Sequence, residues 1–147
     1  MLVSAAHSKG RAVQRKPAEL IGPEQYMQLL QALLDAARGL DPAPQCVVGM
    51  KRSGLFPAVF LSHQLELPML VQSELKGLKR GKFDCVLLVD TTAWKGNSLR
   101  KAALKLERAG CARIHTLVMY ARRDPPPSAP GLHFLCQADS IPRFWYE

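Results

Sequence analysis

Two glycine-containing segments of this chain place polar and charged side chains directly after an apolar run. The first is GMKRSG, residues 49–54, which follows CVV and contains Lys51 and Arg52. The second is DTTAWKGNS, residues 90–98, which follows CVLLV and contains one acid, Asp90. Basic side chains, glycine-rich backbone and the start of a helix together favour phosphate binding. Both segments are therefore candidate anion sites.

Each segment also has a purely structural interpretation. Gly49 and Gly54 suit a tight turn, and Asp90 and Ser98 suit turn formation and helix capping. Neither segment has the G-x-x-x-x-G-K-[ST] spacing of a Walker A loop or the G-x-G-x-x-G spacing of a dinucleotide site. Either segment alone leaves its function open.

The apolar pattern around these segments predicts the elements that position them. Continuous apolar runs predict buried strands, and apolar residues at helical spacing predict helices. Because the two kinds of element alternate, we expect an α/β fold with a mostly parallel central sheet and helices on both faces. Ligands bind such sheets beyond the carboxyl ends of the strands, where both segments lie. The predicted helices are 23–38, 55–67 and 97–110, and the predicted strands are 45–50, 68–72, 85–90, 113–121 and 132–137.

The length of 147 residues suits one domain with a single core. Residues 1–18 contain four bases and no acid and are predicted to form a flexible tail, with residues 19–147 as the domain. The net charge of +8 indicates an anionic partner, either a phosphorylated small molecule or a nucleic acid. The apolar runs are too short to span a bilayer and no long apolar leader is present, so we expect a cytoplasmic protein without a membrane partner.

The four cysteines, Cys46, Cys85, Cys111 and Cys136, each lie in or beside an apolar run. No C-x-x-C pair or histidine-rich partner accompanies them, so no resident metal site is predicted. We interpret them as reduced thiols of the core, in keeping with a cytoplasmic location.

The order and spacing of the two segments resemble the type I phosphoribosyltransferase family, over roughly residues 20–147. In that family a strand ending in a G-x-x-R-G-G-L-like loop binds the pyrophosphate of phosphoribosyl pyrophosphate (PRPP). A later strand ends in two acids and D-T-G-x-T, and binds the ribose and its 5′-phosphate. The stretches VVGMKRSGLFPAVFLSHQLELPML and VLLVDTTAWKGNSLRKAALKLERAG match these elements. The C-terminal ADSIPRFWYE is similar to the aromatic, base-covering end of the xanthine-guanine-like branch.

This resemblance implies the type I phosphoribosyltransferase fold and a role for each matched position. Arg52 would contact pyrophosphate and Asp90 the ribose, as the catalytic residues. Two interpretations are open for the C-terminal aromatics: Phe144 or Trp145 covers the base, or both pack in the core. Mg²⁺ would arrive bound to PRPP. The remaining substrate-binding positions would be Lys51, Ser53, Gly54, Thr91, Thr92, Ala93, Trp94, Lys95, Gly96, Asn97 and Ser98.

Three positions depart from the family motif. Thr91 replaces the second acid, Trp94 replaces the acid that acts near the base nitrogen, and Lys95-Gly96 replaces Thr-Gly at the start of the phosphate loop. Losing a positioned acid or base typically lowers a rate by about 10²–10⁴-fold. Lys95 adds a cation beside the expected 5′-phosphate, and Trp94 is either a flat face for the ligand or a packing residue. Phosphate binding can thus persist while chemistry is weakened.

Three functions remain open. The first is an enzyme that joins a purine-type nucleobase to PRPP and releases pyrophosphate. The second is a catalytically weakened sensor or regulator of the same fold, which binds PRPP or a nucleotide. The third is a nucleic-acid binder, suggested by the charge. A homo-oligomer is also compatible with the sequence.

The polar segment 73–84 is predicted to be a mobile loop or hairpin because it is rich in glycine and charge. Two interpretations are open for its bases: a solvated turn, or a flap that attracts the diphosphate. The bases concerned are Lys76, Lys79, Arg80 and Lys82.

Overall fold

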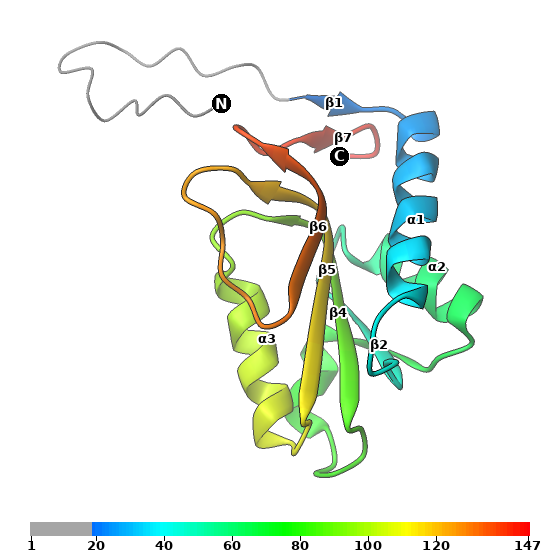
Figure 1. The fold of residues 1–147 in the computed structure, drawn as a ribbon, viewed down its shortest axis with the longest axis vertical. Helices are drawn as coiled ribbons and strands as arrows, with labels where there is room; N and C mark the ends of the chain where they lie inside the picture. The colour runs from blue at the N-terminus through cyan, green and yellow to red at the C-terminus, as the bar shows by residue number, and fades with distance from the viewer. Residues whose placement is uncertain (1–18) are drawn as a thin grey trace, which may run out of the picture.

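Five parallel strands form the central sheet of the computed structural model, which describes residues 19–147 (Figure 1). The strand order is β3-β2-β4-β5-β6, and every neighbouring pair is parallel. The prediction of a mostly parallel α/β sheet is therefore confirmed. The basic segment 1–18 lies outside the described residues. The strands are β2 (Cys46–Gly49), β3 (Met69–Val71), β4 (Cys85–Ala93), β5 (Arg113–Arg122) and β6 (Leu132–Ala138).

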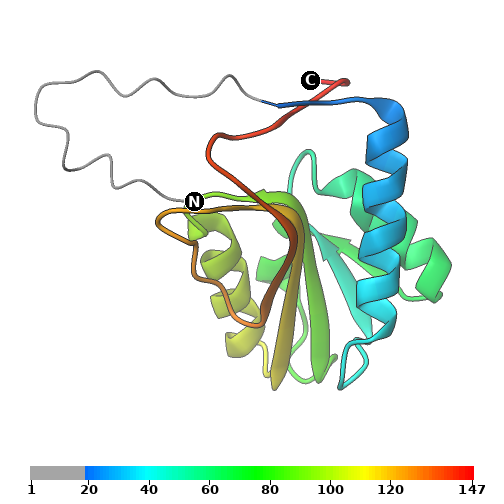
Figure 2. The same cartoon turned by 45° about the horizontal axis from the view of Figure 1, so that its top comes forward.

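Helices cover both faces of this sheet (Figures 1 and 2). Helices α1 (Pro23–Arg38) and α2 (Leu55–Leu65) pack on one face, where they bury Val47, Leu87 and Leu117. Successive strand residues point to opposite faces. The strand residues next to these in sequence therefore point to the other face of the sheet. That face is covered by α3 (Asn97–Arg108) and the 3₁₀ helix η2 (Gln72–Gly77).

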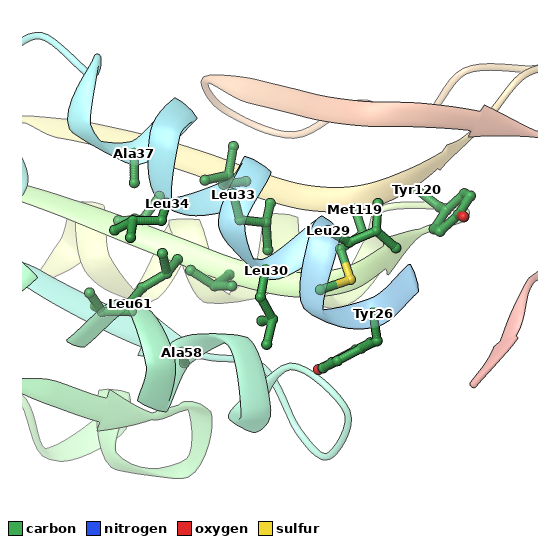
Figure 3. Close-up of a cluster of buried hydrophobic side chains, with 14 of the residues drawn as sticks. Tyr26, Leu29, Leu30, Leu33, Leu34, Ala37, Ala58, Leu61, Met119 and Tyr120 are labelled. Carbon is green, nitrogen blue, oxygen red and sulfur yellow. The ribbon is translucent and has the colours of Figure 1, made fainter. Parts of the chain in front are cut away.

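The α1 face contains the larger of the two hydrophobic clusters (Figure 3). Leu30, Leu33 and Ala37 follow one another along the buried face of α1 and meet α2 and the sheet. Pro23 opens the helix and Gly39 ends it, so the predicted bounds of 23–38 are confirmed.

Strand β4 is longer than predicted and ends at Ala93 instead of Asp90. Thr92 and Ala93 pair with Tyr120 and Ala121 of β5, so sheet pairing with a neighbour extends the strand. Asp90 consequently lies within the strand, near its carboxyl end.

The segment 73–84 differs from the predicted mobile loop. Its first part belongs to η2, which buries Leu75 against the α3 face of the sheet. Its second part packs on the C-terminal end of α3, where the Gly81 N–H donates to the Ala109 carbonyl at 2.8 Å. Because α3 runs antiparallel to the strands, this contact lies at the amino end of the sheet. The second part therefore lies at the opposite end from residues 49–54 and 90–98, which is against the flap interpretation for Arg80 and its neighbours. Lys76 belongs to η2, which begins directly after β3, and its role stays open.

Two short strands join the ends of the described chain. β1 (Leu20–Ile21) pairs in parallel with β7 (Arg143–Phe144), at the top of Figure 1. Phe144 is buried and its ring meets Tyr26 of α1 edge-on, with centroids 5.6 Å apart. Such short strands carry no periodic signal, and the sequence did not indicate this pairing.

The described cysteines are all free. Cys46, Cys85 and Cys111 are buried, while Cys136 is partly exposed. Burial raises the pKa of each of these thiols. Among residues 19–147, no helix combines the length and apolarity required to cross a membrane.

Candidate functional site

The segments 49–54 and 90–98 lie next to each other because β2 and β4 are neighbours. Gly49 pairs with Val89, and the Met50 N–H donates to the Val89 carbonyl at 3.0 Å. Gly54 then packs directly on this backbone: a Cβ at position 54 would lie 2.4 Å from the Met50 oxygen and 2.8 Å from the Val89 oxygen. Only glycine fits there, and its close approach holds the first turn against the second.

A hydrogen bond between side chains joins the two turns. The hydroxyl oxygens of Ser53 and Thr91 are 3.0 Å apart. Thr91 is only 2% exposed, and its backbone N–H donates to a carboxylate oxygen of Asp90 at 2.7 Å. Thr91 thus connects Asp90 to the first turn, and a direct role in ligand binding stays a prediction for this residue.

Asp90 is a partly buried carboxyl at the end of β4. Burial raises its pKa from 3.8 to about 7, against the opposing effect of hydrogen bonds from Thr91 and from the Thr92 backbone. A carboxyl with a pKa near 7 can take up or release a proton at neutral pH. It can also ionise when a cation or hydroxyl donors of a ligand approach.

The second turn encloses a pocket of about 330 Å³. Gly96 adopts a φ of +82° and has no side chain to cap α3, so the first N–H groups of that helix face this turn without intrahelical acceptors. Lys95, Asn97 and Ser98 are exposed at the pocket. This arrangement suits a phosphate group. The pocket is lined by Asp90, Thr92, Ala93, Trp94, Lys95, Gly96, Asn97, Ser98 and Leu99.

Arg100 holds the shape of this turn from outside the pocket. Its guanidinium donates to the Lys95 carbonyl at 3.0 Å, to the Ser128 carbonyl at 2.8 Å, and to the Asn97 side chain. The bond to Ser128 ties the turn to the β5–β6 connection. A Cβ at Gly96 would lie 2.7 Å from that same Ser128 oxygen, so the two loops are in direct contact.

Trp94 faces a cation as well as the pocket. The Arg122 guanidinium lies 5.4 Å from the centre of the Trp94 ring, at the carboxyl end of β5. Cation–π contacts of this kind contribute about 0.5–1 kcal/mol at exposed sites. Trp94 therefore lines the pocket of the second turn and packs against Arg122 at the same time.

A second pocket of about 610 Å³ lies beside the first turn. It is lined by Arg52, Ser53, Phe56, Tyr146 and Glu147. The rings of Phe56 and Tyr146 are 4.9 Å apart, and the buried hydroxyl of Tyr146 has no hydrogen-bond partner among the described residues. Burial raises the pKa of this phenol, so the hydroxyl stays a donor at neutral pH.

The structure separates the predicted site residues into two groups. Arg52, Ser53 and most of the second turn line one of the two pockets, whereas Lys51, Gly54 and Thr91 line neither. Trp145 is 45% exposed and also lines neither pocket; its ring meets Tyr26 edge-on.

The sequence patterns did not reveal Arg100, Arg122 and Tyr146 as site residues. A signal existed for Arg100, because a cation in the first turn of a helix opposes the helix dipole and requires another reason to be there. For Arg122 and Tyr146 the decisive information is strand adjacency and the path of the C-terminal segment. The sequence alone does not contain either.

Magnesium has few protein ligands available here. No group of three or more His, Cys, Asp or Glu side chains within residues 19–147 is arranged to hold a metal ion. Mg²⁺ in phosphate chemistry commonly keeps several waters and binds one or two carboxylates together with the substrate phosphates. Asp90, the one carboxylate that lines the pocket of the second turn, would be a protein ligand for such an ion.

Comparisons with solved structures identify the fold. A purine phosphoribosyltransferase from Pyrococcus horikoshii Ot3 superposes with a TM-score of 0.74 at 21% identity, over 90% of this chain and 95% of that chain. The xanthine-guanine-hypoxanthine phosphoribosyltransferase of Helicobacter pylori superposes with a TM-score of 0.72 at 16% identity, over 88% and 93%. The chain therefore has the type I phosphoribosyltransferase fold.

A third similar structure is a hypothetical protein from Neisseria gonorrhoeae with bound ppGpp. Its TM-score is 0.71 at 14% identity, over 90% of this chain and 91% of that chain. No protein-family model matches the sequence, and no curated protein matches it. At these identities the likeness establishes the fold, while substrate and activity depend on the site.

Proposed function

We propose that this chain binds a phosphoribosyl compound across its two pockets and transfers the phosphoribosyl group from PRPP to a purine-type nucleobase, releasing pyrophosphate. The 5′-phosphate occupies the pocket formed by residues 95–99, with Lys95 and the free N–H groups of α3 as partners. The ribose hydroxyls lie at Asp90, and the pyrophosphate lies at Arg52 with Lys51 nearby.

The observation that supports this proposal is the position of Asp90 between the glycine turn that opens α3 and a pocket lined by Arg52. The Asp90 carboxyl lines the pocket of residues 92–99, and Thr91 links it to Ser53, which lines the pocket of Arg52. A ligand with phosphates at both ends and hydroxyls between them matches this order of charge. PRPP has that distribution.

In the transfer, a ring nitrogen of the base bonds to the anomeric carbon and its proton passes to solvent water, while the bond from that carbon to pyrophosphate breaks with its electron pair leaving on pyrophosphate. Arg52 stabilises the charge that develops on the leaving group. Asp90 accepts hydrogen bonds from the ribose, and Tyr146 with Phe56 offers an aromatic surface beside the reaction centre. Magnesium carried by PRPP neutralises part of the diphosphate charge when it is bound.

A second candidate is a sensor of the same fold that binds PRPP or a nucleotide without turnover. Two observations favour it. The positions of the two missing acids hold Trp94 and Thr91, which are not acids, and both side chains have contacts within the protein: Trp94 with Arg122, and the buried Thr91 with Ser53. The fold also occurs in the Neisseria gonorrhoeae protein whose structure contains ppGpp.

One pair of measurements separates these functions. Isothermal titration calorimetry measures the affinity for PRPP with Mg²⁺, for purine nucleoside monophosphates and for ppGpp, and a coupled assay measures pyrophosphate release with a panel of purine bases. Binding and turnover support the enzyme, whereas binding without turnover on any base supports the sensor. If none of these ligands binds, both functions are wrong.

A further inference from the structure

A group of basic side chains covers the face of the molecule formed by η2, the loop after it and α3. On α3, Lys101, Lys105 and Arg108 are all exposed and follow one another at i, i+4 and i+7. This spacing places them in one row along the helix, over a length of about 10 Å. We call the full set the basic face, and it consists of Lys76, Lys79, Arg80, Lys82, Lys101, Lys105 and Arg108.

Contacts between the two elements make this face continuous. The Arg80 guanidinium donates to the carbonyl of Arg108 at 2.6 Å, which brings the loop onto the end of the helix. Lys79, Arg80 and Lys82 line a groove of about 630 Å³ beside η2. On its other side α3 meets the β5–β6 connection, where Arg100, Leu104 and Glu107 line a separate groove. None of the three α3 bases lines that second groove.

The seven bases of this face outnumber the acids beside them, which are Glu74, Asp84 and Glu107. Within residues 19–147 the only ion pair is that between Arg123 and Asp139. Glu107 points to the opposite side of α3, so the basic face keeps a large positive excess.

The location separates this charge from the proposed ligand site. The two pockets lie at the carboxyl ends of the strands, whereas Arg80 and Arg108 lie at the C-terminal end of α3, at the amino end of the sheet. A bound phosphoribosyl compound therefore gives no reason for these bases.

We propose that the basic face binds the sugar-phosphate backbone of a nucleic acid. A row of bases along α3, continued by the loop, presents repeated cations to a chain of regularly spaced phosphates. Aromatic side chains are scarce on this face: Phe83 is partly buried and lies beneath Lys82, with the ammonium 5.7 Å from the ring centre. The contacts are therefore to phosphates, and binding depends little on base sequence.

An anionic membrane fits this face less well than a nucleic acid. Stable binding to a bilayer surface requires apolar side chains that enter the lipid, in addition to bases. Among the described large hydrophobic side chains that are exposed, only Leu104 belongs to these elements, and it lines the groove on the other side of α3.

The test uses the full chain and fluorescence anisotropy with labelled single-stranded and duplex oligonucleotides of unrelated sequences, titrated at several salt concentrations. The variant combines K101Q, K105Q and R108Q. Its matched control combines R38Q, R123Q and R143Q, which removes the same charge from other elements. We expect the first variant to bind more weakly. Its plot of log K against log salt should be less steep, by about 0.7–0.9 for each phosphate that the protein no longer neutralises. The control should retain more of the affinity and the slope.

Several outcomes would overturn the proposal. Equal reductions in affinity in the two variants would mean that only net charge matters. No binding of either oligonucleotide at low salt, or binding to vesicles of anionic phospholipid but not to oligonucleotides, would also contradict it. Affinity of the same variant for PRPP and nucleoside monophosphates is measured in parallel, so failure of the nucleic-acid proposal is distinguishable from failure of the ligand site.

Discussion

The hydroxyl oxygens of Ser53 and Thr91 lie 3.0 Å apart and connect the two strand-to-helix turns that form the candidate site. Thr91 also fixes Asp90 through its backbone N–H. The position that carries a second acid in the family motif is thus used here to hold two loops in register. The relative position of the two turns therefore depends on a hydrogen bond between two uncharged hydroxyls. Substitution of either residue tests this dependence.

Removal of one member of this pair should destabilise the protein. Ser53→Ala leaves the buried Thr91 hydroxyl without its partner, at a cost of about 1–3 kcal/mol in the free energy of unfolding. Thr91→Val together with Ser53→Ala removes both polar groups, and its cost should be smaller than the sum of the single changes. Urea denaturation of the wild type, both single variants and the double variant measures the coupling. Strict additivity would show that the two hydroxyls do not interact.

Asp90→Asn should change how stability depends on pH. Because burial raises the pKa of Asp90 from 3.8 to about 7, the folded state holds this proton more tightly than the unfolded state. The resulting stabilisation is complete below about pH 4 and is lost as the pH rises towards and beyond 7. Asparagine cannot ionise, so the variant does not lose this stabilisation. From pH 5 to pH 8 the free energy of unfolding of the variant should rise relative to that of the wild type by roughly 1–3 kcal/mol.

Urea denaturation at these two pH values checks the Asp90 prediction. The control, Asp35→Asn on the exposed side of α1, should not reproduce the change. A constant difference between wild type and Asp90→Asn at both pH values would contradict the elevated pKa.

Trp94→Asp should distinguish a weakened enzyme from a sensor. The change places a carboxylate in the pocket beside Lys95 and removes the aromatic ring that Arg122 contacts. If the missing acid limits proton movement on the base, turnover at saturating PRPP should rise by about 10²-fold or more. The assay is pyrophosphate release at saturating PRPP, with Trp94→Asn as the uncharged control. Equal rates of pyrophosphate release in the two variants would show that the absence of this acid does not limit turnover.

Arg100→Gln should weaken phosphate binding although Arg100 does not line the pocket. Its guanidinium holds the Lys95 and Ser128 carbonyls, so its removal loosens the turn that presents the α3 N–H groups. We expect the affinity for a nucleoside monophosphate to fall roughly tenfold, consistent with about 1.5 kcal/mol for hydrogen bonds to a charged group. Calorimetry with Lys101→Gln as the neighbouring control measures this decrease. A similar affinity in both variants would rule out the positioning role.

Tyr146 and Trp145 can be compared within one short segment. Tyr146 lines the pocket of Arg52, whereas Trp145 lies outside both pockets. Tyr146→Ala should therefore reduce nucleotide affinity by about tenfold, as expected when an aromatic partner worth about 1–1.5 kcal/mol is removed, while Trp145→Ala should have a smaller effect. Ligand titration by calorimetry decides between them. The opposite order would support the role that the family resemblance implies for Trp145.

The sequence by itself determined the alternation of strands and helices around the central sheet, and it predicted the kind of site. Continuous apolar runs before residues 49–54 and 90–98, followed by helical spacing, define strand–turn–helix units, and these local patterns need no knowledge of distant residues. They are sufficient to predict a parallel α/β sheet and an anion-binding turn at Asp90–Ser98. The helix of residues 23–38 was predicted to the residue because proline and glycine mark its two ends.

Only the tertiary structure decided which side chains meet. The hydrogen bond between Ser53 and Thr91 and the contact of Arg122 with Trp94 join residues on different strands and turns, and they depend on strand order and register. The same holds for the basic loop of residues 78–84. Its position at the amino end of the sheet depends on packing against α3, including the hydrogen bond from Arg80 to the Arg108 carbonyl. Local sequence specifies what a segment becomes. Its neighbours are fixed by how the helices and strands pack, because the apolar surface to be buried comes from all of them at once.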